Sequence, residues 1–220
     1  MKAQTKNLVN KKLTMLLIAC IVLLYSNMYS QDTYLTYDNN IASEKISEKN
    51  RTNIPKRNII QNNLNYFELE YSFSGLSITN HKVGKTTYNK ISIDGYGHMS
   101  ELGKPELPSH NDVIAVPQNA KIKITIISAE SKEYRGYMIH PALEPAIDTE
   151  GAPDPAFVID NSQYNTNEYY PKDIVKIVDV QKLRGTPLAF VQIRPVQFLK
   201  PVSGNNLLNS LILILSAIDI

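Results

Sequence analysis

The chain has 220 residues, of which 43% are apolar, and a formal net charge of +2. That length allows one domain with a substantial core and excludes two large domains. The basic residues are scattered along the sequence, which excludes the concentrated positive patch typical of a nucleic-acid-binding protein. The chain has no tryptophan but 13 tyrosines, with many isoleucines and valines, and these residue types favour strands.

The first 30 residues have the pattern of a secretory signal peptide. Lysines and no acidic residue lie in residues 1–12, and an apolar run, 13–25, follows. This run is shorter than the roughly 20 residues of a membrane-spanning helix. We expect cleavage between Ser30 and Gln31, which removes Cys20, the one cysteine of the chain, and leaves no stable membrane span.

Two alternatives to cleavage stay open, an uncleaved N-terminal anchor and lipidation of Cys20. The apolar run continues beyond this cysteine, which disfavours lipidation. The exported protein is expected in the periplasm, at the cell surface or outside the cell.

The mature chain is expected to begin with a flexible leader, because residues 31–62 are polar and only weakly periodic. Residues 63–220 are expected to form the folded domain. Alternating apolar residues from Phe67 to Phe73 predict a strand that ends before Gly75. Residues 86–99 repeat the alternation and contain a turn pair, Asp94–Gly95.

The next segments predict a loop over 101–112 and a short buried strand over 113–117. In residues 120–130 three isoleucines, Ile122, Ile124 and Ile126, share one face of a predicted strand. Four prolines between 141 and 155 predict an extended surface connection.

The last part of the chain predicts two strands, within 173–185 and 187–198, that meet at a turn around Arg184–Gly185. A final apolar run predicts one more strand. Short strands separated by glycine and proline turns predict an all-β fold, an antiparallel β-sandwich of jelly-roll type, in residues 63–220.

No catalytic site, cofactor or metal is expected in the mature chain. A cysteine nucleophile is lost with Cys20. The histidines lie in no nucleophile motif and lack the spacing of a zinc site: His81, His98, His110 and His140. The acidic residues of the proline-rich connection lack the ligand spacing of an EF-hand, so a solvated loop is expected: Asp148, Glu150 and Asp154.

Three segments carry a resemblance to a known family. GKPELPSHNDVIAVPQNAKIKITIIS, residues 103–128, resembles the propeptide domain of the gingipain-type (C25) cysteine peptidases, with a G-x-P-x-L-P start and an IA-[VI]-P strand. Residues 141–177 look like the family's P-A-x-x-P and Y-x-x-x-x-x-Y-P region. Residues 183–201 are similar to its RG-x-x-L-A-x-V-x-I-x-P-x-Q-[YF] segment.

The resemblance spans roughly residues 66–212 and implies a non-catalytic pro-segment. In that family the propeptide is a β-sandwich that covers the cysteine peptidase domain, keeps it latent during export and assists its folding. The peptidase domain follows in cis in the family, whereas this chain stops at Ile220. A truncated zymogen and a stand-alone homologue acting in trans are both compatible with the sequence.

The family's peptidases prefer a basic side chain before the cleaved bond, so the resemblance implies a basic residue presented to an acidic specificity pocket. Arg135–Gly136 and Arg184–Gly185 have the required form. Each is also compatible with an ordinary turn arginine in solvent. Arg135 is slightly favoured because it follows a polar strand end.

A second hypothesis is a secreted β-sandwich binding module for a carbohydrate or a surface protein. It predicts an exposed aromatic platform, with Tyr164, Tyr169 and Tyr170 as candidates. The pair before Pro171 is equally compatible with packing at a strand end. A third hypothesis, an active hydrolase, is disfavoured by the missing thiol and motif.

Overall fold

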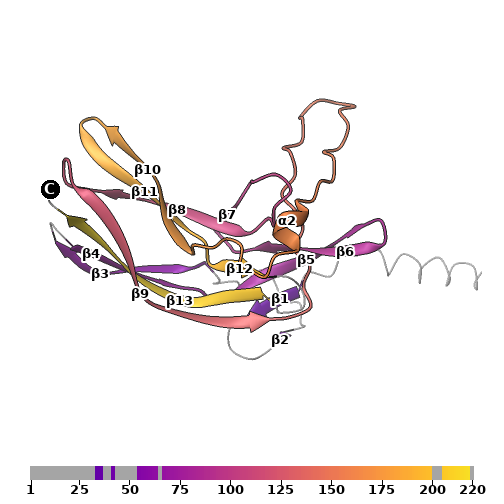
Figure 1. Cartoon of the computed structure of the whole chain (residues 1–220), viewed down its shortest axis with the longest axis horizontal. Coiled ribbons are helices and arrows are strands. Elements are labelled where there is room, and N and C mark those ends of the chain that lie inside the picture. The colour runs from indigo at the N-terminus through magenta and orange to yellow at the C-terminus, as the bar shows by residue number, and fades with distance from the viewer. Residues whose placement is uncertain (1–32, 37–40, 43–53, 64–65, 200–204, 219–220) are drawn as a thin grey trace, which may run out of the picture. The chain divides into compact units, whose positions relative to one another are not determined.

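The computed structural model describes residues 33–36, 41–42, 54–63, 66–199 and 205–218, and most of them lie in strands (Figure 1). The expected signal peptide lies outside these residues. The strands are β1 (Thr33–Thr36), β2 (Ile41–Ala42), β3 (Lys56–Asn63), β4 (Tyr66–Ser72), β5 (Gly75–Val83), β6 (Thr86–Ser92), β7 (Gly97–His98), β8 (Pro108–Ala115), β9 (Lys121–Tyr134), β10 (Val175–Leu183), β11 (Thr186–Ile193), β12 (Val196–Phe198) and β13 (Asn205–Ile218). One short helix, α2 (Asn161–Tyr164), lies among the described residues.

The strands form three sheets whose neighbouring strands are antiparallel. The first has the order β2-β1-β5-β6 and the second β10-β11-β8-β7. The third has the order β12-β13-β4-β3, with β9 paired along β13. The all-β, antiparallel β-sandwich prediction is therefore confirmed. Within the described ranges, no helix has the length and hydropathy of a membrane span.

One hydrophobic core joins the three sheets. Leu35 and Ile78 reach it from the first sheet, Val191 from the second, and Leu69 and Phe198 from the third. The predicted alternation in β4 is confirmed, since every second side chain from Leu69 is buried. Burial of apolar side chains at about 1.5–3 kcal/mol each is the main force that stabilises these sheets against one another.

Two parts of the sequence are more ordered than expected. Of residues 31–62, expected to be a flexible leader, Thr33–Thr36 pairs with β5 and Lys56–Asn63 pairs with β4. The loop expected over 101–112 is also shorter, because β8 already begins at Pro108. The short segments β1 and β8 pair with strands that are distant in the sequence, and local hydrophobic periodicity does not report such pairing.

Gly75 begins β5 and pairs with Thr36 of β1. A Cβ atom at this position would lie 2.2 Å from the carbonyl oxygen of Leu35 and 2.7 Å from the hydroxyl of Tyr34. We expect Gly75→Ala to lower the free energy of unfolding by about 1–3 kcal/mol, because the added methyl group overpacks this contact. Urea unfolding measures the loss, and amide hydrogen exchange at Tyr34 and Leu35 locates it in β1.

Gly97→Ala is the matched control for this substitution. A Cβ atom there meets nothing closer than 3.8 Å, the carbonyl oxygen of Ser109. Its free energy of unfolding is expected to stay within about 0.5 kcal/mol of that of the parent chain. Equal stability of the two variants would show that β1 does not pack on β5 as described.

Candidate functional site

Arg184 lies at the tip of the β10–β11 hairpin. Leu183 pairs with Thr186, so the connection is a two-residue turn made of Arg184 and Gly185, as the sequence predicted. Both residues have a positive φ, 50° and 87°, which is the backbone of a type I′ turn. The side-chain amide of Gln118 donates to the carbonyl oxygen of Gly185 at 2.5 Å. The turn that exposes Arg184 is therefore fixed both by the β10–β11 pairing and by this hydrogen bond.

Arg135 follows the end of β9 and is also exposed. Its side chain is 72% accessible, and its Nε donates to Glu133 at 3.0 Å. An exposed ion pair of this kind contributes at most about 1 kcal/mol and leaves the guanidinium available to a partner. Gly136 has a positive φ of 87°, so the chain turns sharply directly after the arginine.

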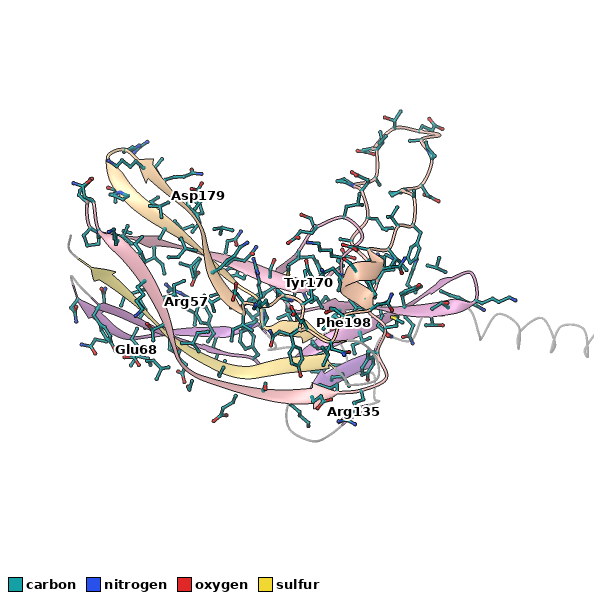
Figure 2. All side chains as sticks on the ribbon, in the orientation of Figure 1. Arg57, Glu68, Arg135, Tyr170, Asp179 and Phe198 are labelled. Atoms are coloured by element: carbon teal, nitrogen blue, oxygen red, sulfur yellow. The ribbon has the colours of Figure 1, made fainter. Side chains whose placement is uncertain are left out.

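The structure does not bring the two arginines together. Arg135 lies at the lower right of Figure 2, whereas the turn between β10 and β11 lies at the upper left of Figure 1. Each would therefore approach a partner with a different surface of the domain.

A long connection between β9 and α2 projects from the strands (Figure 1). Its two ends are fixed on Gly103 and Lys104: Gly103 donates to Ala142, Ala142 donates back to Lys104, and Asp160 donates to Gly103. Between them, residues 144–151 are all exposed. The expectation of an extended surface connection is confirmed, and this stretch contains acidic but no basic residues.

A polar network centred on Asp112 connects β8 with the sheet that contains β3 and β4. Arg57 Nε donates to the Asp112 carboxylate at 2.7 Å, and the hydroxyl of Tyr71 donates to the same oxygen. His110 Nε2 lies 3.4 Å from the other oxygen, and its ring stacks on Tyr96. Burial and the Asp112 carboxylate raise the pKa of the Tyr71 hydroxyl, so the hydroxyl stays a donor.

This network is built for structure rather than for nucleophilic chemistry. The carboxylate accepts hydrogen bonds from Arg57 and Tyr71 of the sheet that contains β3 and β4, and no serine, threonine or cysteine among the described residues hydrogen-bonds to it. Within the part of the chain that the structure describes, no group of three histidine, cysteine or acidic residues could hold a metal ion.

Two histidines that are 59 positions apart meet at the core. The rings of His81 and His140 are 5.0 Å apart, and His140 is 1% exposed. Among the described residues neither ring nitrogen of His140 has a hydrogen-bond partner of ordinary geometry, and its Nδ1 lies 3.6 Å from Glu106. Burial lowers the pKa of His140, and the charges of Lys90 and His81 lower it further.

The depressed pKa of His140 makes stability depend on pH. The unfolded chain binds the proton near pH 6.5, whereas the folded chain binds it only at lower pH, so stability falls as pH decreases below about 6.5. We expect the urea midpoint to drop less between pH 7.5 and pH 5 in His140→Gln than in the parent chain. Lys121→Gln, at an exposed position of β9, is the control and should keep the parent's pH dependence.

The proposed aromatic platform is not present as predicted. Tyr164 and Tyr170 are each 7% exposed, and only Tyr169 reaches solvent, at 38%. The hydroxyl of Tyr164 donates to the carbonyl oxygen of Ile139 at 2.9 Å, and its ring packs on Phe198. These tyrosines pack at a strand end, which removes the specific support for a carbohydrate-binding surface.

Comparison with known proteins shows which family the chain resembles. Residues 43–216 match the family model Propeptide_C25. Lys-gingipain and Lys-gingipain W83, both from Porphyromonas gingivalis, are 26% identical over 145 residues. That match covers 62% of this chain and 8% of each relative, so the chain corresponds to a small part of them.

Two solved structures have the same fold. One, from a study of the zymogenic latency of gingipain K of P. gingivalis, aligns with a TM-score of 0.65 and 21% identity over 86% of this chain and all of that chain. The other is a complex of the RgpB pro- and mature domains of P. gingivalis, with a TM-score of 0.67 and 19% identity over 74% of this chain and 85% of that chain. The chain therefore belongs to the propeptide family of the C25 peptidases.

Proposed function

We propose that this chain is a non-catalytic latency domain that binds a C25 cysteine peptidase domain and blocks its cleft. The observation that carries the proposal is the family match over residues 43–216. The fold supports it, because the solved neighbours include a propeptide in complex with a mature domain. The partner is linked in cis in the longer relatives, and this chain acts on it in cis or in trans.

The domain inhibits by presenting a basic side chain on a rigid turn. A guanidinium on a pre-formed turn loses little conformational entropy on binding and pairs with a carboxylate through two hydrogen bonds. Arg184 on its type I′ turn meets this requirement, and Arg135 is the second candidate as an exposed arginine directly before a bend at Gly136. Neither is covered by other parts of the described structure.

Substituting the correct arginine is expected to weaken inhibition of the cognate peptidase. A buried basic anchor is worth about 2 kcal/mol or more, so Arg135→Ala or Arg184→Ala should raise the inhibition constant about 30-fold. Lys85→Ala, in the exposed turn between β5 and β6, is the matched control and should leave it unchanged. If neither arginine variant weakens inhibition by the purified domain, this site assignment is wrong.

The same domain also assists folding of the peptidase. A compact β-sandwich that folds first offers a surface on which the peptidase domain can order. Refolding the denatured peptidase domain with this chain should return more active enzyme, once the inhibitor is removed, than refolding without it.

Export precedes both roles in this proposal. Residues 1–30 are the signal peptide, and the β-sandwich that follows includes β1 and β3 from the segment expected to be a leader. The latency domain then works in the periplasm, at the cell surface or outside the cell. Sequencing the amino terminus of the exported protein tests the cut between Ser30 and Gln31.

A further inference from the structure

A cavity of about 330 Å³ lies beside α2, and one of its walls is a buried arginine. Arg194, between β11 and β12, is only 6% exposed. Its backbone amide donates to Ile174, which fixes this residue between the two strands. The cavity opens to solvent, and its other lining residues lie between 162 and 173 and in the segment that contains Glu101 and Lys104.

The guanidinium of Arg194 has only neutral acceptors. Its Nε donates to the side-chain oxygen of Gln192 at 2.8 Å, and one terminal nitrogen donates to the carbonyl oxygen of Asp173 at 3.5 Å. No carboxylate oxygen of a residue that the structure describes lies within 4.0 Å of it. A buried charge without an opposite charge is costly, and it gains strongly from an anion that reaches it.

The other charged residues of the cavity do not replace this anion. Glu101 pairs with Lys104 at 2.5 Å. The lining residues include four cations, Lys104, Lys172, Lys176 and Arg194, and three carboxylates, Glu101, Glu168 and Asp173, which leaves a net charge of +1. One monovalent anion brings the net charge of the cavity to zero, whereas a dianionic phosphate would bring it to −1.

A second buried polar group lies in the same wall. Tyr170 is 7% exposed, and the charged group with the largest effect on its hydroxyl is the Glu101 carboxylate, with no hydrogen bond of ordinary geometry among the described residues. Burial and the charge of Glu101 raise the pKa of this hydroxyl, so it stays protonated and keeps a hydrogen to donate. Figure 2 shows Tyr170 beside Phe198 at the centre of the domain.

We propose that this cavity binds one carboxylate group, which pairs with the guanidinium of Arg194. The positive charges of Lys172 and Lys176, which also line the cavity, favour binding of this anion. The planar guanidinium matches a carboxylate through two parallel hydrogen bonds. The carboxylate belongs either to a small organic acid or to an acidic side chain of a protein partner. The second source rests on the proposed latency function, and the first does not.

Acetate is the probe for the first experiment, which uses the whole chain without a peptidase. Thermal unfolding is measured in sodium acetate and in sodium chloride of equal ionic strength, and the NMR signal of Arg194 Nε–H is followed. We expect a saturable rise of the melting temperature and a saturable shift of that signal in acetate alone.

Variants separate binding from a merely structural role. Arg194→Lys keeps the charge but loses the planar fork, and should weaken acetate binding at least ~10-fold. Lys176→Gln, at an exposed position, should weaken it about three-fold without harming the fold. Lys121→Gln, in β9, is the control that binds like the parent. No acetate-specific response in the parent, or the same response in Arg194→Lys and Lys176→Gln as in the parent, would overturn the proposal.

A second experiment identifies the source of the carboxylate once acetate binding is established. The affinity of the chain for its peptidase is measured in acetate and in chloride. Competition by acetate assigns the cavity to an acidic side chain of the peptidase, and unchanged affinity assigns it to a small organic acid.

Discussion

Phe198→Ala is expected to lower the free energy of unfolding by about 3–5 kcal/mol, as large aromatic-to-alanine changes in a core do. Phe198 is 1% exposed, and its ring centroid lies 5.3 Å from that of Tyr164. Its backbone exchanges two hydrogen bonds with Tyr170, so this residue joins β12 to the chain that follows α2. Truncation leaves a cavity where several parts of the fold meet.

Urea unfolding followed by far-ultraviolet circular dichroism measures this loss. Val113→Ala is the control, because Val113 is 51% exposed on β8. It should cost about 0.5 kcal/mol or less. A loss below about 1 kcal/mol for Phe198→Ala would contradict the placement of this ring at the centre of the core.

Asp112→Ala is expected to cost about 2–4 kcal/mol, although the residue lies on a strand with a partly exposed surface. Its carboxylate accepts hydrogen bonds from Arg57 and Tyr71, which come from the opposite sheet. The side chain of Asp112 is 14% exposed and that of Arg57 is 36% exposed. Without the carboxylate, the buried hydroxyl of Tyr71 and the partly buried guanidinium of Arg57 lose their acceptor. Because Arg57 is partly exposed to water, the loss of stability is expected to be smaller than for a fully buried ion pair.

The same network gives a graded test. Tyr71→Phe removes one hydrogen bond and should cost about 1–2 kcal/mol, and the double variant with Asp112→Ala should cost less than the sum of the two. Asp148→Ala, in the exposed connection after β9, is the control and should be neutral. Additive losses would show that Tyr71 and Asp112 do not interact.

Local pattern was sufficient to predict the strands that form hairpins or carry an apolar stripe. Ile122 and Ile124 in β9 pack against the core as the alternation indicated, whereas Ile126, predicted on the same face, is 42% exposed beside a register shift in the pairing with β13. Arg184–Gly185 forms the turn expected between two strong strands. Asp94–Gly95 likewise precedes β7, with Gly95 at a positive φ of 78°. These features depend on neighbours in sequence, so the sequence shows them directly.

Features made by distant residues could not be predicted in this way. β1 is a short strand that buries Tyr34 and Leu35 and pairs with β5, and β3 is an exposed strand that pairs with β4. The ion pair of Arg57 and Asp112 joins residues 55 positions apart. The burial of Tyr170 and Arg194 also depends on the packing of α2 and β12, and their residue types alone suggest surface positions.

The two candidate arginines could be identified in the sequence, but their positions relative to each other in the fold could not. Both are exposed, and they lie on different parts of the domain. Arg184 lies in a tight hairpin turn, whereas Arg135 follows the end of β9 and precedes a bend at Gly136. Which of them enters a specificity pocket depends on the shape of the partner.

The central claim is that this chain works by binding a peptidase domain and has no hydrolytic activity of its own. The most direct measurement is to mix the purified exported form with its cognate mature C25 peptidase domain and record complex formation and peptide hydrolysis together. We expect a 1:1 complex in which hydrolysis is suppressed, and no hydrolysis by the chain alone. A peptidase that stays free and fully active, or peptide-bond cleavage by the chain alone, would contradict the claim.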